Sequence, residues 1–458
     1  MLLGEIFERF IQDAPIPVLF RLFLLRALDP QELDRTFQQH AQSQYTRELL
    51  FSHVVKVMAL AVFKVHSSLR QAYLHSQQEL LVSLSALYEK LQGTEPGVCR
   101  GFVVNSAGRL RVVIAQVHGE LKSPLPGYRV KIVDGNHLAG AEHRPKVTRE
   151  VAAAILPGQT LVVLDAQTQL VVDVIPCEDG HAQERSLVGA VLEGVESGDL
   201  WIADRNFCCR SFVFGVVGRH GSFLVRQHQT SLPWEATGDW TDCGQCESGR
   251  VQEQQIRLLP AAGDETEAIS ARRIRLVLDQ ATEGGEIELF LVTNVLETET
   301  TGAELVNLYR KRWTIENAFQ TLTCALKCEV NTLAYPKAAL LGFCVALAGY
   351  NALMAVRAAI RAAHGAEEVE GKISNYGMME DISSTTKGMM IALPEKAWKA
   401  FDQIGDEAFG EQVLEIAHQV QLWRYPLGKR GAKRPRPPRT MEKGKPHVSM
   451  AKLLKDQK

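Results

Sequence analysis

The sequence lacks an excess of charge of either sign, a regular cysteine spacing and an internal repeat. Its 458 residues carry a formal net charge of -2, and its nine cysteines are an odd number. These absences argue against an extracellular disulfide scaffold and against a repeat architecture. Because Cys208, Cys209 and Cys344 stand in apolar runs, the composition indicates buried thiols and a reducing, cytoplasmic setting.

Long hydrophobic runs are also scarce. Glu5, Glu8 and Asp13 interrupt the N-terminal apolar residues, so we expect no secretory signal there. The one long uncharged run, residues 338–356, has 19 residues, close to the length of a membrane span. It also contains Asn351 and several Gly and Ala residues, which favours a buried core helix and leaves a span as the alternative. We therefore expect no membrane partner.

The composition that remains is that of an ordinary globular protein, 46% hydrophobic and 23% charged, with a length that suits two or three domains. The charge is unevenly spread. Residues 429–458 hold 11 Lys and Arg against 2 Asp and Glu, which leaves the other 428 residues with a balance of -11. A basic tail on an acidic body suggests an arm that binds a polyanion, and a solvated tail without a partner is the alternative.

The order of secondary-structure patterns indicates the fold class. The first hundred residues have helical spacing, as at Leu19, Leu22 and Leu25. Alternating or β-branched runs then predict three strands, a helix and a fourth strand, over residues 128–134, 160–164, 170–175, 182–195 and 200–204. The first and fourth strands end in Asp134 and Asp204. This order predicts an α/β, ribonuclease-H-like fold, a mixed sheet flanked by helices.

Further strands over 222–227 and 286–295 flank a polar, β-rich stretch, and a long helix is predicted over 302–327. The predicted organisation is a helical N-terminal DNA-binding region (1–95), the first part of a catalytic core (96–228), a β-rich insertion (229–285), the second part of the core (286–360), a helical C-terminal region (361–428) and the basic tail (429–458).

Carboxylates at strand ends suggest phosphodiester chemistry. Two divalent ions about 4 Å apart can clamp the attacking and leaving oxygens of a phosphoryl group. Hard ions such as Mg²⁺ prefer carboxylate oxygens, so the site needs about three acids from different elements. Asp134 and Asp204, together with an acid on a nearby helix, would meet this requirement.

The predicted helix supplies that acid. At 100° per residue, Tyr309, Arg312 and Glu316 share one face, with Arg312 about 60° and Glu316 about 20° behind Tyr309. Glu316 is suited to hold a metal, while Arg312 and Tyr309 are suited to contact DNA phosphates. An exposed helix face with an Arg–Glu pair at i, i+4 is the alternative.

These motifs together resemble the DDE transposases of the bacterial insertion-sequence family four. The hallmark of that family is Tyr-x2-Arg-x3-Glu-x6-Lys, and Tyr309, Arg312 and Glu316 stand at its spacing. The contexts Asp134-Gly-Asn-His and Asp204-Arg-Asn-Phe also resemble the family, as does Leu308-Tyr-Arg-Lys-Arg-Trp-Thr-Ile-Glu-Asn. The similarity runs from about residue 96 to residue 439.

The resemblance implies a cut-and-paste transposase of the bacterial cytoplasm and nucleoid. Such an enzyme recognises terminal inverted repeats on double-stranded DNA and pairs two ends, as a homodimer. It nicks each end, releases the element through a hairpin and joins the 3′-hydroxyl ends to target DNA. Asp134, Asp204 and Glu316 would bind two Mg²⁺ (or Mn²⁺) ions, and Tyr309 and Arg312 would hold phosphates at the transposon end.

One position departs from the hallmark. Thr323 stands where the family has Lys, and Lys327 projects one turn later at the angle of Tyr309, where it would reach the phosphate instead. Arg205 and Asn206, which follow Asp204, are further candidates for DNA contacts or for orienting that acid.

Four other features carry weaker interpretations. Glu184 is a candidate supporting acid, and His137 fits a loop residue without function better than a DNA contact. Cys243-Gly-Gln-Cys246 has the spacing of half a zinc site without an evident second half, so a turn is the simpler interpretation. Family members stack a flipped base on an aromatic residue of the insertion, for which Trp234 and Trp240 are the candidates, with packing as the alternative.

Two competing functions fit the same residues. A nuclease on the same fold would keep the acids but would not pair DNA ends. A catalytically impaired DNA-binding derivative of a transposase would be consistent with Thr323, although three intact acids argue against it.

Overall fold

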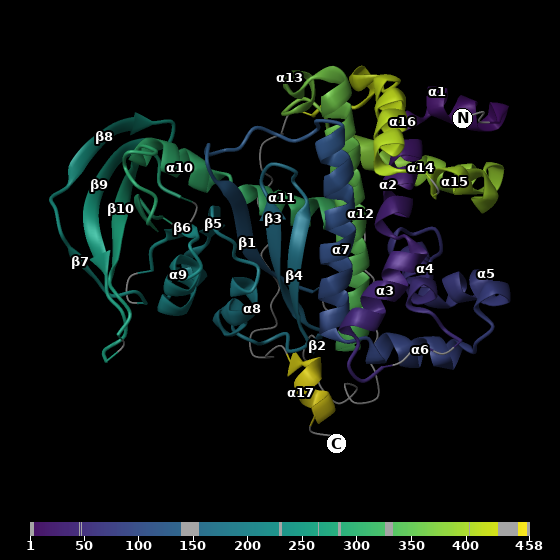
Figure 1. The fold of residues 1–458 in the computed structure, drawn as a ribbon, viewed down its shortest axis with the longest axis horizontal. Helices are drawn as coiled ribbons and strands as arrows, with labels where there is room; N and C mark the ends of the chain where they lie inside the picture. Colours follow the sequence, from purple (N-terminus) through teal and green to yellow (C-terminus); the bar gives the residue numbers. More distant parts are fainter. Residues whose placement is uncertain are drawn as a thin grey trace.

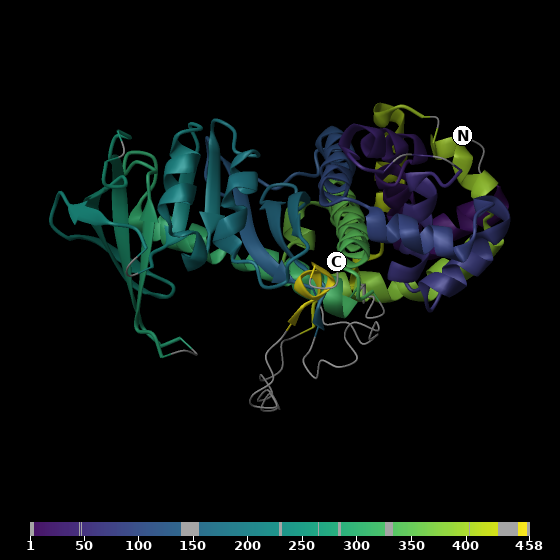
Figure 2. The same ribbon diagram turned by 90° about the horizontal axis from the view of Figure 1, so that it is seen from below.

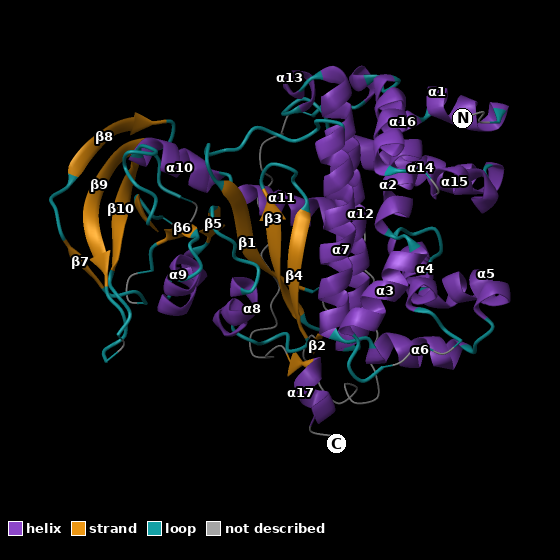
Figure 3. Ribbon diagram, in the orientation of Figure 1, coloured by secondary structure: helices purple, strands orange, loops and turns teal. Residues whose placement is uncertain are grey.

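The computed structural model describes residues 4–44, 46, 48–138, 155–228, 231–263, 265–282, 285–325, 333–402, 404–428 and 448–455. The molecule is elongated, with a helical half next to a half built around a sheet (Figures 1 and 2). The helical half combines the two ends of the sequence, whereas the strands come from the middle of the chain (Figure 3).

In the described residues the main sheet has ten strands, in the order β4-β3-β1-β5-β6-β11-β10-β9-β7, with β8 paired to β9. The strands are β1 (Arg129–His137), β3 (Gln159–Asp165), β4 (Val171–Cys177), β5 (Asp199–Ala203), β6 (Ser222–Arg226), β7 (Trp234–Ala236), β8 (Thr241–Cys246), β9 (Gly249–Leu258), β10 (Ile269–Leu278) and β11 (Glu288–Thr293). β5 runs parallel to β1 and to β6, and the other pairs are antiparallel. The predicted mixed α/β sheet flanked by helices is therefore confirmed.

Both faces of the central strands are covered, and this explains their apolar sequences. Every residue of β3 is buried. In β1, Val130 and Ile132 belong to the large core shared with the helical half, whereas Val133 packs in a second core with α8 (Val188–Leu192) and α9 (Arg210–Val217). The alternation read from the sequence therefore assigns these side chains to the correct faces.

The predicted strands are all present, with ends shifted by a few residues. The β-rich stretch between β6 and β11 extends the same sheet. The helix predicted over 182–195 is shorter, a 3₁₀ turn η2 (Glu184–Leu187) followed by α8. Another 3₁₀ turn, η3 (Arg205–Phe207), follows β5, and neither α9 nor α7 (Pro96–Gln116) was predicted.

The long helix predicted over 302–327 is wrong as a single element. It consists of α10 (Gly302–Arg310), α11 (Trp313–Gln320) and a π-helical turn, η4 (Thr321–Ala325). At the break, the N–H groups of Lys311 and Arg312 bond to carbonyls three residues back, at 2.9 Å each, which is the tighter 3₁₀ pattern. The regular 100° per residue is therefore interrupted between Tyr309 and Glu316, although Arg312 still contacts Glu316 and lies next to Tyr309.

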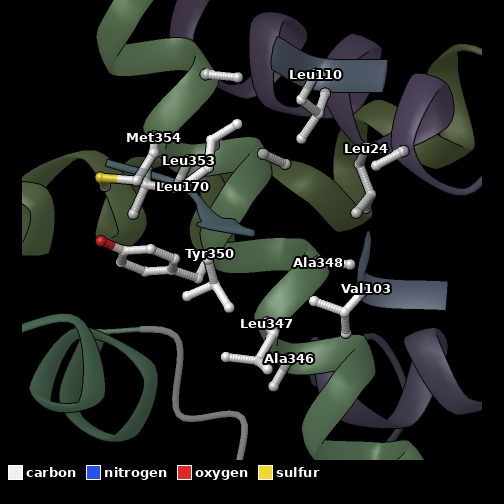
Figure 4. Packing of buried hydrophobic residues seen from close by; sticks show 14 of the residues in the cluster. Leu24, Val103, Leu110, Leu170, Ala346, Leu347, Ala348, Tyr350, Leu353 and Met354 are labelled. Carbon is white, nitrogen blue, oxygen red and sulfur yellow. The ribbon is translucent and has the colours of Figure 1, made fainter. Parts of the chain in front are cut away.

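The long uncharged run lies in α12 (Pro336–His364), which packs side by side with α7. Its most apolar window is 89% buried inside the protein. Leu347, Tyr350 and Leu353 lie in a packed core with side chains from other elements, among them Val103 and Leu110 (Figure 4). The prediction of a buried core helix is confirmed.

The remaining helices pack mainly around α12 and α7, and the helical prediction for the first hundred residues is confirmed. They are α1 (Glu5–Asp13), α2 (Pro15–Ala27), α3 (Pro30–His40), α4 (Phe51–Val62), α5 (Leu69–Leu80), α6 (Leu84–Gly93), α13 (Ala366–Val369), α14 (Asn375–Ala392), α15 (Glu395–Asp402), α16 (Asp406–His418) and the 3₁₀ turn η5 (Leu422–Arg424).

Part of the predicted basic tail is ordered against the core. β12 (Val448–Ser449) pairs in parallel with β2 (Ile155–Leu156), and α17 (Met450–Lys455) follows it. The Lys- and Arg-rich stretch 429–447 lies outside the described residues.

Asn351 of α12 is expected to be a stabilising contact with the edge strand β4. Its amide accepts a hydrogen bond from the N–H of Val171 and donates one to the C=O of Val171, both at 2.8 Å and both buried. Asn351→Leu leaves that backbone unpaired, so the free energy of unfolding should fall by about 1–3 kcal/mol. Denaturant unfolding measures this. The exposed control Asn307→Leu should change it by less than about 0.5 kcal/mol, and an equal effect of the two variants would contradict the assignment.

Candidate active site

The first two predicted acids lie on neighbouring parallel strands. Val133 of β1 is paired with Ala203 of β5, so Asp134 and Asp204 are the next residues of both strands. Adjacent strands are about 4.8 Å apart, which brings the two carboxylates into one neighbourhood. Asp204 is oriented by η3, because its Oδ1 accepts the N–H of Asn206 at 2.8 Å.

Arg312 joins the third acid to the first. Its Nη1 donates to Asp134 Oδ2 at 2.6 Å, and its Nη2 donates to Glu316 Oε1 at 2.7 Å. The Arg312 and Asp134 side chains are only 13% and 15% exposed, whereas Glu316 is 45% exposed. One guanidinium therefore links β1 to α11, and the helix break places Arg312 at the start of α11.

The electrostatics of the site are those of crowded carboxylates. Burial, together with the neighbouring charges of Asp204 and Glu184, raises the pKa of Asp134 to about 6, against the opposing effect of Arg312. The pKa of Arg312 is raised despite its burial, because Tyr309, Asp134 and Glu316 surround it. The site thus concentrates negative charge around one cation.

Tyr309 lies beneath this cluster. Burial and the charge of Asp204 raise the pKa of its phenol to about 12, while Arg312 and Arg226 oppose the shift. Tyr309 is therefore a neutral hydrogen-bonding group at neutral pH. Arg226, at the end of β6, was not identified from the sequence. Its signal would have been a basic residue at the end of the strand next to β5.

The carboxylate oxygens of Asp134, Asp204 and Glu316 are chemically suited to bind a divalent metal ion, provided that the Arg312 side chain moves away. Carboxylate oxygens from β1, the end of β5 and α11 are the ligands that hard cations prefer. In the described part of the chain, however, no group of three or more His, Cys, Asp or Glu side chains is arranged as a metal site. Arg312 occupies the position between Asp134 and Glu316, so binding an ion to both acids requires the guanidinium to move.

The other candidates for DNA contacts, Arg205, Asn206 and His137, differ in their surroundings. Arg205 is exposed. The side chain of Asn206 bonds to Glu184, and its carbonyl accepts from Arg185. His137 is exposed at the end of β1.

The position of the missing lysine is only partly described. Thr323 lies in the π-helical turn, where its hydroxyl donates to the carbonyls of Phe319 and Gln320. Lys327 lies outside the described residues.

The tryptophans of the insertion belong to one aromatic cluster. The guanidinium of Arg273 lies over the rings of Trp234, Trp240 and Phe290, at 4.5, 5.3 and 4.2 Å. Both Trp234 and Trp240 therefore pack on the same cation.

Cys243 and Cys246 are free, half-buried thiols on β8. Burial and the adjacent Glu253 raise the pKa of Cys243 to about 11, so this thiol is protonated at neutral pH.

Protonation of Asp134 should leave a signature in the pH dependence of stability. The unfolded carboxyl ionises near 3.8 and the folded one near 6, so the native state binds more protons between these values. The free energy of unfolding of the metal-free protein should therefore decline from about pH 4 to pH 6, by at most about 3 kcal/mol from this group.

Asp134→Asn should remove this decline, measured by denaturant unfolding at a series of pH values. The control Asp242→Asn removes an exposed carboxylate paired with Arg250 and should leave the decline in place. A decline of equal size in Asp134→Asn would show that another group titrates.

Comparison with known proteins gives one family match. Residues 126–346 match the family model described as transposase DDE domain. No curated protein matches the chain significantly. Among solved structures, the piggyBac transposase synaptic complex with hairpin DNA is 10% identical with a TM-score of 0.37, covering 89% of this chain and 86% of that chain. Over residues 126–346, which include Asp134, Asp204 and Glu316, the chain is thus similar to the transposase DDE domain family.

Proposed function

We propose that this protein is a DNA transposase that cleaves DNA at transposon ends and joins the freed 3′-hydroxyl ends to target DNA. The observation that carries the proposal is that Arg312 bridges Asp134 and Glu316, with Asp204 near Asp134 at the neighbouring strand, within the region that matches the transposase DDE domain. Carboxylates from two parallel strands and a following helix are suited to phosphodiester cleavage and transfer.

The fold supports this proposal. The order β4-β3-β1-β5-β6, antiparallel on one side of β1 and parallel on the other, is the arrangement expected for a ribonuclease-H-like core. Parallel strands bring their carboxyl ends to one edge, where Asp134 and Asp204 follow paired residues. The apolar strands beneath make a rigid base for the acids.

Asp134, Asp204 and Glu316 would hold two Mg²⁺ or Mn²⁺ ions. Bound there, such ions would activate the attacking oxygen and stabilise the leaving oxygen. The residues of the chain have separate tasks. Asp204 presents one oxygen while the other accepts the N–H of Asn206, and Arg312, once released from the acids, is suited to bind a DNA phosphate with two donors.

Tyr309, partly buried beside Arg312, is suited to donate a hydrogen bond to a phosphate oxygen, because its raised pKa keeps the proton on the phenol. Arg205 is exposed and suited to contact the DNA backbone. Asn206 is already committed to Glu184, so we assign it to orienting Asp204 rather than to DNA.

The finer mechanism also belongs to the proposal. We infer recognition of terminal inverted repeats, pairing of two ends by a homodimer, and release through a hairpin, in the cytoplasm of a bacterium. The helical N-terminal region and the basic stretch 429–447 are the proposed additional contacts with DNA, the latter through phosphates without sequence preference.

One observation favours a second function, a catalytically impaired DNA-binding derivative. The Thr323 hydroxyl bonds back to its own helix, so it does not replace the cation of the hallmark. A nuclease without end pairing would cleave DNA but would fail in a strand-transfer assay.

Loss of any one acid should abolish cleavage. Asp134→Ala, Asp204→Ala and Glu316→Ala should each reduce the nicking of supercoiled DNA with Mg²⁺ on the order of 10³-fold, because each removes an oxygen ligand. The control Asp242→Asn removes an exposed acid of the insertion and should cleave normally. A variant that keeps full cleavage would remove its residue from the site.

Lys327 is expected to take over the phosphate contact of the missing lysine. Lys327→Ala should weaken cleavage roughly tenfold and lower the salt slope of DNA binding by about 1. The control Lys372→Ala, an exposed lysine paired with Glu368, should change neither. Adding Thr323→Lys to Lys327→Ala should restore cleavage. Unchanged cleavage by Lys327→Ala would disprove the idea that Lys327 replaces the lysine of the hallmark.

A further inference from the structure

The carboxylate of Glu184 lies beside the acidic site formed by Asp134, Asp204 and Glu316. Glu184 begins η2, the short turn between β4 and α8. Its side chain lies directly against Gly135, the residue after Asp134. A Cβ added at Gly135 would lie 2.0 Å from Glu184 Oε1, a distance that no real contact allows. Gly135 therefore leaves the space that the Glu184 carboxylate occupies beside β1.

The other oxygen of Glu184 is tied to the second acid. Glu184 Oε2 accepts the side-chain amide of Asn206 at 3.0 Å. The backbone N–H of the same Asn206 donates to Asp204 Oδ1 at 2.8 Å. Arg185, the next residue of η2, donates through Nε to the carbonyl of Asn206 at 2.8 Å. Asn206 is thus held at its side chain and its carbonyl by η2, while its N–H orients Asp204.

We propose that Glu184 is a positioning residue that spans the two strand-end acids and, through Asn206, fixes the orientation of the Asp204 carboxylate relative to Asp134. This inference rests on the proposed function of the site. Groups that orient metal ligands commonly change metal affinity or activity by about 10- to 100-fold when they are removed. Glu184 acts through its geometry, because one of its oxygens lies beside Gly135 of β1 and the other accepts from Asn206.

The choice of substitutions separates positioning from charge. Glu184→Gln keeps an oxygen that can accept the Asn206 amide but removes the negative charge. Glu184→Ala removes both. A positioning role therefore predicts near-normal behaviour for Glu184→Gln and a loss for Glu184→Ala, whereas a purely electrostatic role predicts equal losses.

Gly135→Ala gives a second test without changing Glu184. The added methyl group would displace the carboxylate, since the far end of a flexible side chain can move away. Gly135→Ala should reproduce the defect of Glu184→Ala, and the double variant should be no worse than either single variant, because both remove the same interaction.

The experiment measures Mn²⁺ binding to the full-length protein by electron paramagnetic resonance, with Mn²⁺-dependent nicking of supercoiled DNA in parallel. Glu184→Ala and Gly135→Ala should weaken Mn²⁺ binding about 10- to 100-fold, and Glu184→Gln should stay within about threefold of the unchanged protein. The control Glu196→Gln removes an exposed acid paired with Arg129, away from the site, and should bind Mn²⁺ normally. Thermal unfolding establishes that each variant is folded.

The outcomes distinguish this inference from the proposed function. If the unchanged protein binds Mn²⁺ and nicks DNA but Glu184→Ala does the same, the inference is wrong and the transposase assignment stands. Equal losses in Glu184→Gln and Glu184→Ala also overturn it. If the unchanged protein neither binds Mn²⁺ nor cleaves DNA, the proposed function fails, and the role of Glu184 fails with it.

Discussion

The two hydrogen bonds of the Arg312 guanidinium, to Asp134 and to Glu316, are the interaction on which the site depends. Asp134 is nearly buried within β1, next to the apolar residues Ile132 and Val133. A buried carboxylate without a partner would cost several kcal/mol, so the cluster requires a cation. In the structure Arg312 provides that charge, and it thereby fastens α11 to β1.

Several elements of the fold position this contact. The central strands are covered on both faces, so the charged side chains within them, such as Lys131 and Asp173, are paired. The break between α10 and α11 places Arg312 next to Asp134, and the capping box of Thr301 and Glu304 fixes where α10 begins. A π-helical turn follows α11, the helix that carries Glu316, and such turns often occur at functional sites.

Local sequence patterns predicted part of the fold around the site. Alternation in β1 distinguishes the face of Val130 and Ile132 from the face of Val133. Asp204 directly follows β5 as predicted, whereas the strand predicted to end at Asp134 continues to His137. The contact between Arg312 and Glu316 is the i, i+4 pair that the spacing offered as the alternative interpretation of this helix face. The approach of Asp204 to Asp134 depends on the pairing of β1 with β5. The paired residues are about 70 positions apart in the sequence, so no local pattern predicts which strands pair.

The missed elements have particular physical reasons. α9 is rich in Phe and Val, which favour strands, but parallel β5 and β6 require a crossover between them, and a helix supplies it. α7 contains several glycines, which disfavour helices. One of them, Gly101, is needed because a Cβ there would lie 2.4 Å from the His40 ring. In both cases tertiary packing overrides local propensity.

The proposed function implies that a metal ion held by Asp134, Asp204 and Glu316 would displace the Arg312 guanidinium from between Asp134 and Glu316. A crystal soaked in Mn²⁺ and measured at the manganese absorption edge tests it most directly. Manganese held there should give anomalous peaks coordinated by these three carboxylates, with the guanidinium displaced from Asp134. An Arg312 that still bridges Asp134 and Glu316, with no manganese at the three acids, would contradict it.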